Sequence, residues 1–418
     1  MILFSHPTGN ANVRHAALGL QRAGLLSEFW TCINHQPDGI FSRLLPGGLR
    51  QQLARRAFPA ELQPHLRSYP FLEYGRLLAG RFGPAFLTRH EKGQLSVDAV
   101  YRSLDRRVCR RLRRARNITG VYAYEDGAAD TFREANRRGL RTLYDLPIGY
   151  WRAARDLLIE EAQREPEWAS TLIGNEDSPA KTDRKDEELA LADTVYVASS
   201  FTLKTLSSAP AFRAKVEVIP YGAPPRPVNA PVRTRRAASG PLRAIFVGSL
   251  GQRKGLSYLF QARRALGRGT ELTVIGTLPL QPCPALEREL KQVRWIPSCP
   301  HATVLAEMAA HDVFVFPSLF EGFGLVLLEA MAMGLPILTT AHTAGPDLID
   351  DGIEGFIVPI RSAAAITEKM ELLRANPALI DEMGARAAAR ASTFTWASYE
   401  SRLATSVAKA CQTTLGKA

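Results

Sequence analysis

The chain has 418 residues, of which 46% are apolar and 22% charged, and its formal charge is +12. This length predicts two to three domains, and this composition is that of an ordinary globular protein with a large core. The five widely spaced cysteines form no CxxC pair, so neither a disulfide framework nor a zinc site is expected. No apolar run reaches about 18 residues, so no membrane span is expected. These features predict a cytoplasmic location.

The positive charge is concentrated in the first part of the chain. Residues 1–120 hold 19 basic and 7 acidic side chains, whereas the other 298 residues hold 34 of each. This asymmetry favours an anionic partner for the N-terminal part, with peripheral contact to an anionic membrane as one form. The use of 43 arginines against 10 lysines leaves coding bias as the alternative. Nucleic acid is not an expected partner, because the basic region lacks interleaved aromatic residues and a recognisable module.

In chain order, short apolar or β-branched runs alternate with helical patterns. This alternation predicts an α/β fold of parallel sheets covered by helices, and a dozen strands are too many for one typical sheet. The predicted strands are Met1–Phe4, Phe29–Asn34, Val121–Tyr124, Arg141–Tyr144, Thr194–Ala198, Val216–Ile219, Arg243–Val247, Glu271–Ile275, Val293–Ile296, Asp312–Phe316, Leu335–Thr339 and Gly355–Val358.

Residues 36–120 fit this scheme least well, because they contain few strand signals and several Arg-rich helical stretches. In Val100–Ala115, apolar residues at helical spacing are surrounded by arginines. This pattern is typical of a basic amphipathic helix on anionic lipid or on an anionic acceptor, and equally of a surface helix with a solvated face. Leu49–Leu62, with three further arginines, slightly favours the first interpretation.

A proline- and arginine-rich segment, residues 223–241, has the composition of a linker. It divides the chain into an N-terminal domain, 1–222, and a C-terminal domain, 242–395, each of which opens with a strand, a glycine turn and a helix. Two domains of this kind predict doubly wound, Rossmann-like sheets facing a cleft. Residues 396–418 predict a C-terminal helix that packs back on the N-terminal domain.

The most informative stretch is Asp312–Thr340, in which a buried strand runs into the glycine turn Glu321-Gly322-Phe323-Gly324 and then into a helix from about Leu325. A helix N-terminus presents free N–H groups that suit a phosphate, and glycines let a ligand approach the backbone. Glu321 in the turn and Glu329 in the helix are suited to binding sugar and ribose hydroxyls. A structural turn with a capping glutamate is the alternative, since a G-x-G turn alone is weak evidence.

The second informative stretch is Phe246–Gly255, where a strand ends in a glycine turn that includes Gly251 and is followed by Arg253 and Lys254. Two fixed cations at the carboxyl end of a strand are well placed to neutralise a diphosphate and to stabilise charge on a leaving group. A lone pair of cations would more often be solvated. Its position after a glycine turn, in the domain that holds the acidic glycine turn, favours the functional interpretation.

These stretches resemble the donor domain of GT-B-fold glycosyltransferases, in particular the retaining family 4, or group 1, class. The resemblance covers Phe246–Pro359 in matching order and spacing, and the first half matches more weakly. The segments that carry it are VGSLGQRKG (Val247–Gly255), PSLFEGFGLVLLEAMAMGLPIL (Pro317–Leu338), DLIDDGIEGFIVP (Asp347–Pro359), DEELALADTVYVASSFT (Asp186–Thr202), VEVIPYGA (Val216–Ala223) and GNANVRHAALGLQRAG (Gly9–Gly24). Residues 36–120 and 150–185 match nothing nameable.

The resemblance implies roles for individual residues. Arg253 and Lys254 would bind the diphosphate of a nucleotide-sugar, Glu321 the sugar hydroxyls and Glu329 the ribose. The backbone of Gly322–Leu325 would meet the phosphate or sugar, and the turn at Ile296 would line the base pocket. The two glycine turns, with Gly9 and Gly251, would lie at the donor site. No metal or other cofactor is expected, since Arg253 and Lys254 would neutralise the diphosphate charge that a metal ion neutralises in other enzymes.

One departure concerns the N-terminal domain, where many members of the family carry a histidine after the strand that corresponds to Arg141–Tyr144. This chain has none there, so Asp145, or Glu125-Asp126 after the preceding strand, could face the cleft instead. A helix cap or turn is an equally good interpretation of these carboxylates. His6 and His15 near the first glycine turn rank below them.

The resemblance therefore implies a retaining glycosyltransferase that moves a sugar from a nucleotide-sugar to a glycan, lipid-linked or other polar acceptor in cell-surface polysaccharide synthesis. The alternative is a non-catalytic nucleotide-sugar-binding protein of the same fold, against which the complete set Arg253, Lys254, Glu321 and Glu329 argues. A phosphorylase or sucrose-synthase-like enzyme is a further option, for which the chain is short and lacks a cofactor lysine signature.

Overall fold

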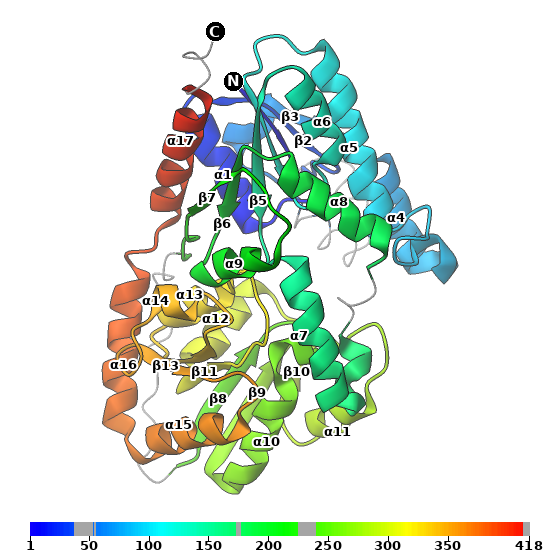
Figure 1. Ribbon diagram of the computed structural model, residues 1–418. Helices are drawn as coiled ribbons and strands as arrows, with labels where there is room; N and C mark the ends of the chain where they lie inside the picture. Colours follow the sequence, from blue (N-terminus) through cyan, green and yellow to red (C-terminus); the bar gives the residue numbers. More distant parts are fainter. Residues whose placement is uncertain (37–52, 54–55, 173–176, 225–239, 413–418) are drawn as a thin grey trace.

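Two parallel sheets form two α/β domains stacked one above the other in the computed structural model, which describes residues 1–36, 53, 56–172, 177–224 and 240–412 (Figure 1). Every strand pair found between these residues is parallel. The predicted linker lies almost wholly outside the described residues. The twelve predicted strands are confirmed, and the second one lies three residues earlier than predicted.

The first sheet has seven strands in the order β3-β2-β1-β4-β5-β6-β7. Its strands are β1 (Ile2–Ser5), β2 (Leu26–Thr31), β3 (Leu66–Ser68), β4 (Gly120–Tyr124), β5 (Arg141–Leu146), β6 (Thr194–Val197) and β7 (Lys215–Val218). Helices of this half are α1 (Ala11–Arg22), α4 (Phe71–Phe82), α5 (Val97–Arg114), α6 (Ala129–Arg137), α7 (Trp151–Arg164), α8 (Pro179–Ala190) and α9 (Ser200–Thr205). All residues of β1, β4 and β6 are buried, as helices on both faces of a parallel sheet require.

The second sheet has six strands in the order β10-β9-β8-β11-β12-β13. They are β8 (Leu242–Val247), β9 (Thr270–Ile275), β10 (Arg294–Ile296), β11 (Val313–Phe316), β12 (Ile337–Thr340) and β13 (Gly355–Val358). Its helices are α10 (Leu256–Leu266), α11 (Pro284–Leu290), α12 (His301–Ala309), α13 (Leu325–Ala332), α14 (Gly345–Leu348), α15 (Ala363–Ala375) and α16 (Pro377–Ala391). The apolar strand Val313–Phe316 lies at the centre of the sheet and is fully buried.

Both sheets reverse their strand order beside their first strand, between β1 and β4 in one domain and between β8 and β11 in the other. Ligands of open α/β sheets bind outside the carboxyl ends of strands at such a switch point. The turns after β1 and β4 therefore face one binding region, and the turns after β8 and β11 face another. The second pair of turns carries Arg253, Lys254 and Glu321.

The last helix, α17 (Trp396–Gln412), returns to the N-terminal domain and runs beside α1 (Figure 1). The Trp396 ring stacks on His15 with ring centres 4.1 Å apart, and Glu400 accepts hydrogen bonds from His15 and Arg22 at 2.6 and 2.5 Å. The N–H of Ala223 donates to the carbonyl of Phe394 at 2.7 Å. The two chain segments that cross between the domains thus lie side by side.

Helix α7 and the short helix η3 (Pro166–Thr171) cross in the opposite direction and pack on the second domain. Glu161 of α7 is fully buried and accepts hydrogen bonds from Gln252 at 2.7 Å, Tyr258 at 2.9 Å and Arg361 at 2.7 Å. Thr171 accepts from the N–H of Gln252 at 2.8 Å. Helices α7 and η3, which belong to the segment 150–185 without a recognisable family match in the sequence, therefore support the loop that carries Arg253 and Lys254.

Candidate active site

The loop after β8 holds Arg253 and Lys254 in the short helix η6 (Gln252–Lys254). Gly255 ends this helix with φ at +69°, and a Cβ there would lie 2.1 Å from the carbonyl oxygen of Pro317. Only glycine combines that left-handed conformation with so close an approach. The turn after β8 is thereby held against the residues that follow β11.

Both cations contact the carboxylate of Glu321. Arg253 donates to Glu321 Oε1 at 3.3 Å and to the Phe320 carbonyl at 2.7 Å, and Lys254 pairs with Glu321 Oε2. Lys254 is 7% exposed, and its Nζ lies 4.7 Å from the centre of the Phe316 ring. Burial lowers the pKa of Arg253 to about 10, and burial together with the Arg253 charge lowers that of Lys254. An anion that binds beside two buried cations offsets the free-energy cost of keeping both charges out of water, so this pair favours anion binding.

Helix α13 begins at Leu325 after Gly324, whose φ of +82° turns the chain into the helix. No side chain caps this N-terminus, so its N–H groups and partial positive charge remain suited to an anion. One turn later, Glu329 Oε1 lies 2.9 Å from Nε2 of His301, the first residue of α12. This hydrogen bond raises the pKa of His301.

These groups line a cavity of ≈ 460 Å³, named cavity A. Its walls include the charged residues Lys254, His301, Glu321 and Glu329 together with Phe323, Gly324 and Leu325 from the second domain. The first domain contributes Asn10, Asn12, Pro147 and Tyr221. Cavity A therefore combines cations, a helix N-terminus and two carboxylates, and its volume is that of a small-molecule site.

Gly322 contacts the other domain. Its carbonyl accepts hydrogen bonds from Ser199 and, at 2.9 Å, from Thr202. A Cβ at Gly322 would lie 1.9 Å from the Pro147 carbonyl oxygen, and one at Gly149 would lie 2.4 Å from the Phe320 ring. The glycine turn after β11 therefore interlocks with the turn after β5.

We expect Gly322→Ala to open this interlock, because the added methyl group cannot fit against Pro147. The sugar-transfer activity that the family resemblance implies should fall roughly 10- to 100-fold as the two domains lose their register, and the radius of gyration in solution scattering should rise. Gly80→Ala is the matched control, since a Cβ at Gly80 meets nothing within 4 Å. A Gly322→Ala protein with unchanged scattering and activity would contradict the role given to this contact.

A second cavity of ≈ 450 Å³, named cavity B, lies between the domains. Its second-domain wall includes Gly251, Arg253 and Lys254, so Lys254 lines both cavities. Its first-domain wall includes Gly149, Trp151, Arg155, Asp177, Thr182, Lys185 and Glu125. Lys254 is therefore accessible from both cavities, and Arg253 from cavity B.

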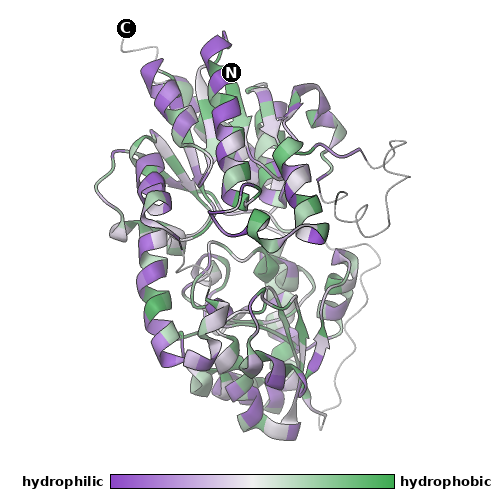
Figure 2. Cartoon of the chain, turned by 90° about the vertical axis from the view of Figure 1, so that its right-hand side faces the viewer, coloured by the Kyte–Doolittle hydropathy of each residue, from purple (hydrophilic) through white to green (hydrophobic). Residues whose placement is uncertain are grey.

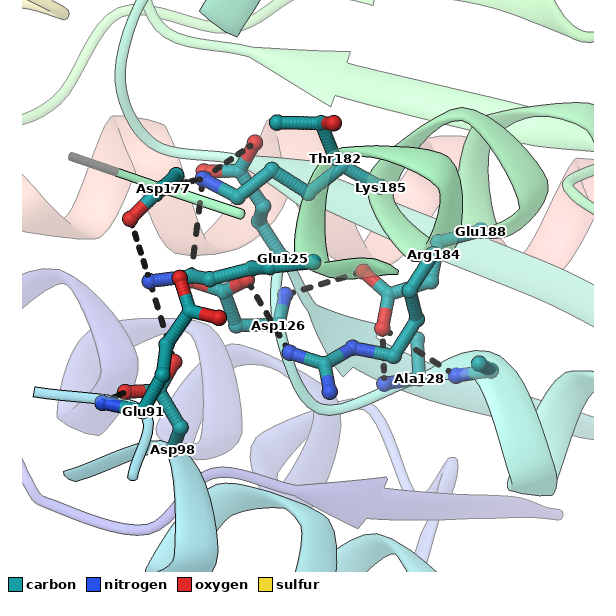
Figure 3. Close-up of polar contacts among 12 residues, drawn as sticks. Glu91, Asp98, Glu125, Asp126, Ala128, Asp177, Thr182, Arg184, Lys185 and Glu188 are labelled. Carbon is teal, nitrogen blue, oxygen red and sulfur yellow. Dashed lines mark hydrogen bonds and ion pairs between the residues drawn. The ribbon is translucent and has the colours of Figure 1, made fainter. Parts of the chain in front are cut away.

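The polar wall of cavity B is built around Lys185, whose ammonium lies 3.5 Å from Glu125 Oε1, 3.6 Å from Asp177 and 3.7 Å from Asp126 (Figure 3). Glu125 is 9% exposed, and its Oε1 accepts no hydrogen bond from the described residues. Burial raises the pKa of Glu125 to about 7, although the Lys185 charge opposes that shift. Glu125 thus lies beside cavity B as a buried carboxylate that is paired with Lys185.

The buried Glu188 fixes the turn that carries Glu125. Its carboxylate accepts from the N–H groups of Asp126 and Ala128, each at 2.9 Å (Figure 3). Asp126 has φ at +71°, which turns the chain sharply after β4. The turn that carries Glu125 is therefore held in place by the side chain of Glu188 in α8.

Several predicted site residues lie outside both cavities. Asp145 is 3% exposed, accepts from the Tyr122 hydroxyl at 2.6 Å and lines neither cavity; burial raises its pKa to about 7. Its side chain lies on the face of the sheet that carries Tyr122, because Asp145 is still part of β5 and pairs with Tyr124 of β4. Gly9 and Ile296 also line neither cavity, and a Cβ at Gly9 would meet the Phe58 ring at 2.6 Å.

The two histidines near the first glycine turn have structural contacts. His6 accepts from the Thr8 N–H at 3.0 Å, and burial lowers its pKa to about 4. His15 binds Trp396 and Glu400 as described above. Sequence reasoning missed Asn10, Asn12 and His301. The switch-point rule could have indicated the asparagines after β1, whereas nothing local connects His301 with Glu329.

Among the described residues, His90, Glu91 and Asp177 are the group that could place three metal-ligand atoms within 4.8 Å of one another. Asp177 Oδ1 already lies 3.0 Å from both His90 Nε2 and Lys181 Nζ. The carboxylate is thus neutralised by side chains, and the group carries no assignment as a metal site.

Residues 241–376 match the family model described as glycosyl transferases group 1. The amylovoran biosynthesis glycosyltransferase AmsK of Erwinia amylovora is 31% identical over 194 residues, which are 43% of this chain and 47% of that protein. The chain spans less than half the length of the curated relatives it matches first.

Two solved structures match nearly the whole chain. Anabaena HepE in complex with UDP and glucose superposes with a TM-score of 0.63 at 14% identity, over 98% of this chain and 99% of that one. Sucrose-phosphate synthase from Thermosynechococcus elongatus has a TM-score of 0.65 at 17% identity, over 100% and 99%. Residues 241–376 therefore match the group 1 glycosyltransferase family, and the chain as a whole has the GT-B fold of two Rossmann-like domains.

Proposed function

We propose that this chain is a glycosyltransferase that moves a sugar from a nucleotide-sugar onto an acceptor hydroxyl with retention of anomeric configuration. The observation that carries the proposal is the convergence of Lys254, the N-terminus of α13 and two glutamates on cavity A, with Arg253 bound to one of these glutamates, Glu321. Cations and helix N–H groups suit a diphosphate, and carboxylates suit the hydroxyls of a sugar and a ribose.

In this proposal the diphosphate competes with Glu321 for Arg253 and Lys254. Binding of the donor releases the carboxylate, which then accepts hydrogen bonds from the donor sugar. The acceptor hydroxyl oxygen forms its bond to the anomeric carbon as the bond between the sugar and the diphosphate breaks, and the leaving phosphate takes the hydroxyl proton. The charge that grows on this phosphate lies beside two buried cations. Glu329, oriented by His301, binds the ribose. Catalysis in this scheme needs no metal ion.

The relatives support this reaction and a cellular setting. AmsK is named for amylovoran biosynthesis, and HepE was solved with UDP and glucose. We accordingly propose a role in the synthesis of a cell-surface polysaccharide at the cytoplasmic face of the membrane, with a glycan, a lipid-linked sugar or another polar molecule as acceptor. A uridine nucleotide is the first donor class to test.

We further propose that cavity B holds the acceptor. It meets cavity A at Lys254, so an acceptor there would adjoin the leaving phosphate. The Glu125 carboxylate can accept a hydrogen bond and the Lys185 ammonium can donate one, and both residues line cavity B, so together they suit a hydroxyl group. Glu125, named among the alternatives for the acceptor side in the sequence, replaces Asp145 as the carboxylate that we place at this site.

Thermal shift with a panel of nucleotide-sugars tests the donor site. A ligand at about 100 times its dissociation constant should stabilise the folded chain by about 2.7 kcal/mol. Glu329→Ala should weaken this response, whereas Glu382→Ala, at an exposed carboxylate, should not. A chain that responds to no nucleoside diphosphate or its sugar would refute the proposal.

A non-catalytic nucleotide-sugar-binding protein is the alternative, and it predicts the same thermal shift. The two are separated by donor hydrolysis without acceptor, which an enzyme catalyses slowly and a binding protein does not. The anomeric configuration of the transferred sugar, read by NMR, tests retention separately.

A further inference from the structure

Helix α4 and the short helix η2 (Ala85–Thr88) present a row of large apolar side chains to solvent. Five of the thirteen exposed large apolar residues among the described residues lie in this segment of sixteen. Their exposed fractions are Phe71 77%, Tyr74 41%, Leu78 54%, Phe82 79% and Phe86 67%. The first four are spaced three and four residues apart, which places them on one face of the helix. We call these five residues the α4 stripe.

The opposite side of α4 anchors the helix in the domain. Glu73 is 2% exposed and accepts hydrogen bonds from Arg56 at 2.5 Å and Arg76 at 2.7 Å. Leu72 and Leu77 pack on the core cluster of the first sheet. Because these contacts hold the far side of the helix, the α4 stripe faces outward as a fixed surface. Figure 2 faces the side of the molecule on which α4 lies in Figure 1.

The charges around the stripe have one sign. In residues 62–120, all of which the structure describes, every exposed Lys, Arg, Asp or Glu is basic. They are Arg67, Arg81, Arg89, Lys92, Arg106, Arg107, Arg110, Arg113, Arg114 and Arg116. Of the acidic residues in this range, Glu73, Asp98 and Asp105 are buried and Glu91 is half-buried. In residues 62–120 the basic excess therefore lies at the surface, and the carboxylates that offset it are buried or half-buried.

The basic and apolar groups adjoin one another. The Arg81 guanidinium lies 5.5 Å from the centre of the Phe82 ring. Arg107 of α5 lies 5.6 Å from the centre of the Tyr69 ring, and Tyr69 meets the ring of Phe71 at 5.9 Å. The α4 stripe is thus bordered by arginines from its own helix and from α5.

We propose that the α4 stripe inserts into the headgroup region of an anionic phospholipid bilayer while the bordering arginines bind lipid phosphates. Aromatic rings beside arginines are the side chains favoured at a membrane interface, and an apolar face combined with basic charge binds anionic lipid. No helix among the described residues is both long and apolar enough to span a bilayer, so contact through this face would be interfacial. The proposal is independent of catalysis and does not require that the chain transfer sugar.

Vesicle co-sedimentation tests the proposal without donor or acceptor. The full chain is mixed with vesicles of phosphatidylcholine alone and with vesicles of phosphatidylcholine and phosphatidylglycerol at 7:3. We expect binding to the anionic vesicles to exceed binding to the neutral ones, and to weaken as salt shortens the reach of the charges. Equal binding to both compositions would overturn the electrostatic part.

Substitutions separate the stripe from the charge. Phe71→Ser/Phe82→Ser/Phe86→Ser should lower the partition onto anionic vesicles roughly tenfold or more, since apolar burial drives insertion. Leu203→Ser/Ile353→Ser/Leu372→Ser, at exposed apolar residues elsewhere, should leave it unchanged. As the folding control, both variants should unfold cooperatively on heating, as the wild type does. Equal loss in the two variants would overturn the assignment of the stripe.

The oligomeric state of the same proteins tests whether a second copy of the chain covers the α4 stripe instead of a membrane. If a second copy of the chain covered the α4 stripe, the wild type would dimerise in solution and the stripe variant would be monomeric with unchanged vesicle binding. That result would refute the membrane proposal. A Phe82→Trp variant provides an independent check, because brominated lipids should quench its added fluorescence and should not quench that of Leu372→Trp.

Discussion

Replacing Lys254 by methionine should lower the rate of sugar transfer about 10²- to 10³-fold and leave the fold intact. Lys254 is buried, pairs with Glu321 and lines both cavities. Methionine fills nearly the same volume without the charge, so the packing against Phe316 is kept. The loss should appear mainly in kcat, because the charge on the leaving diphosphate is largest in the transition state.

The measurement is steady-state transfer with a nucleotide-sugar, together with thermal unfolding of each protein. Lys291→Met is the matched control, since Lys291 is an exposed lysine of the same domain. Because Arg253 still pairs with Glu321, Lys254→Met removes the second buried cation and leaves a neutral pair, so the variant should be at least as stable as the wild type. A variant that retains full transfer with the correct donor would show that Lys254 has no part in the chemistry.

The donor side of this site was predictable because its signals are local. The strand, the glycine turn and the helix that follow one another at Val313–Ala332 are encoded by consecutive residues, and so are the turn and cations at Gly248–Gly255. A left-handed φ at Gly255 and at Gly324 accounts for two of these glycines. Gly322 was assigned to a ligand, and in the structure it contacts the other domain. Its sequence signal was that of close approach, which does not say what approaches.

The side that we propose for the acceptor was harder to predict because its contacts are distant in sequence. The pair Glu125 and Lys185 joins residues sixty apart, and Glu161 binds residues of the other domain that lie 91 to 200 positions further along the chain. Asp145 lies one residue before the end of β5, and Glu125 directly follows β4. Only the pairing of Asp145 with Tyr124 shows that the Asp145 side chain lies on the face of Tyr124, whereas Glu125 faces cavity B. In residues 62–92, β3 has only three residues, which is too short for a strand pattern to be recognised. Helix α4 has apolar residues on its exposed face, so its sequence does not alternate as an amphipathic helix should.

These contacts give the cleft a common organisation. The loop of Arg253 and Lys254 is supported by α7 from the first half of the chain, and the loop of Glu321 is held by Ser199 and Thr202 of the N-terminal domain. Each donor-side loop therefore depends on the other domain for its position. A change in the relative orientation of the domains would move both loops at once, which couples the geometry of cavity A to the closure of the cleft.

Glu125→Gln should lower the kcat/KM for the acceptor about 100-fold and leave the KM of the donor unchanged. Burial raises the pKa of Glu125 to about 7 from the usual 4.5. The wild-type rate should therefore fall as the pH drops below about 7, where the carboxyl group gains a proton, loses its negative charge and accepts a hydrogen bond from the acceptor more weakly. Glutamine does not titrate, so the variant should lose this acid limb of the pH profile.

Stability should change in the opposite direction, which distinguishes a binding role from a structural one. The folded chain holds the proton on Glu125 more tightly than the unfolded chain does, so the stability that this proton adds is present near pH 5 and is lost as the pH rises through about 7. Above pH 7 the wild type bears a buried carboxylate that Glu125→Gln lacks, and we expect the variant to unfold at a higher temperature at pH 8. Glu382→Gln, at an exposed carboxylate, should change neither activity nor stability. A Glu125→Gln protein that transfers normally, or that loses stability together with activity at pH 8, would refute the assignment, because the carboxylate would then serve the fold through Lys185 and not the acceptor.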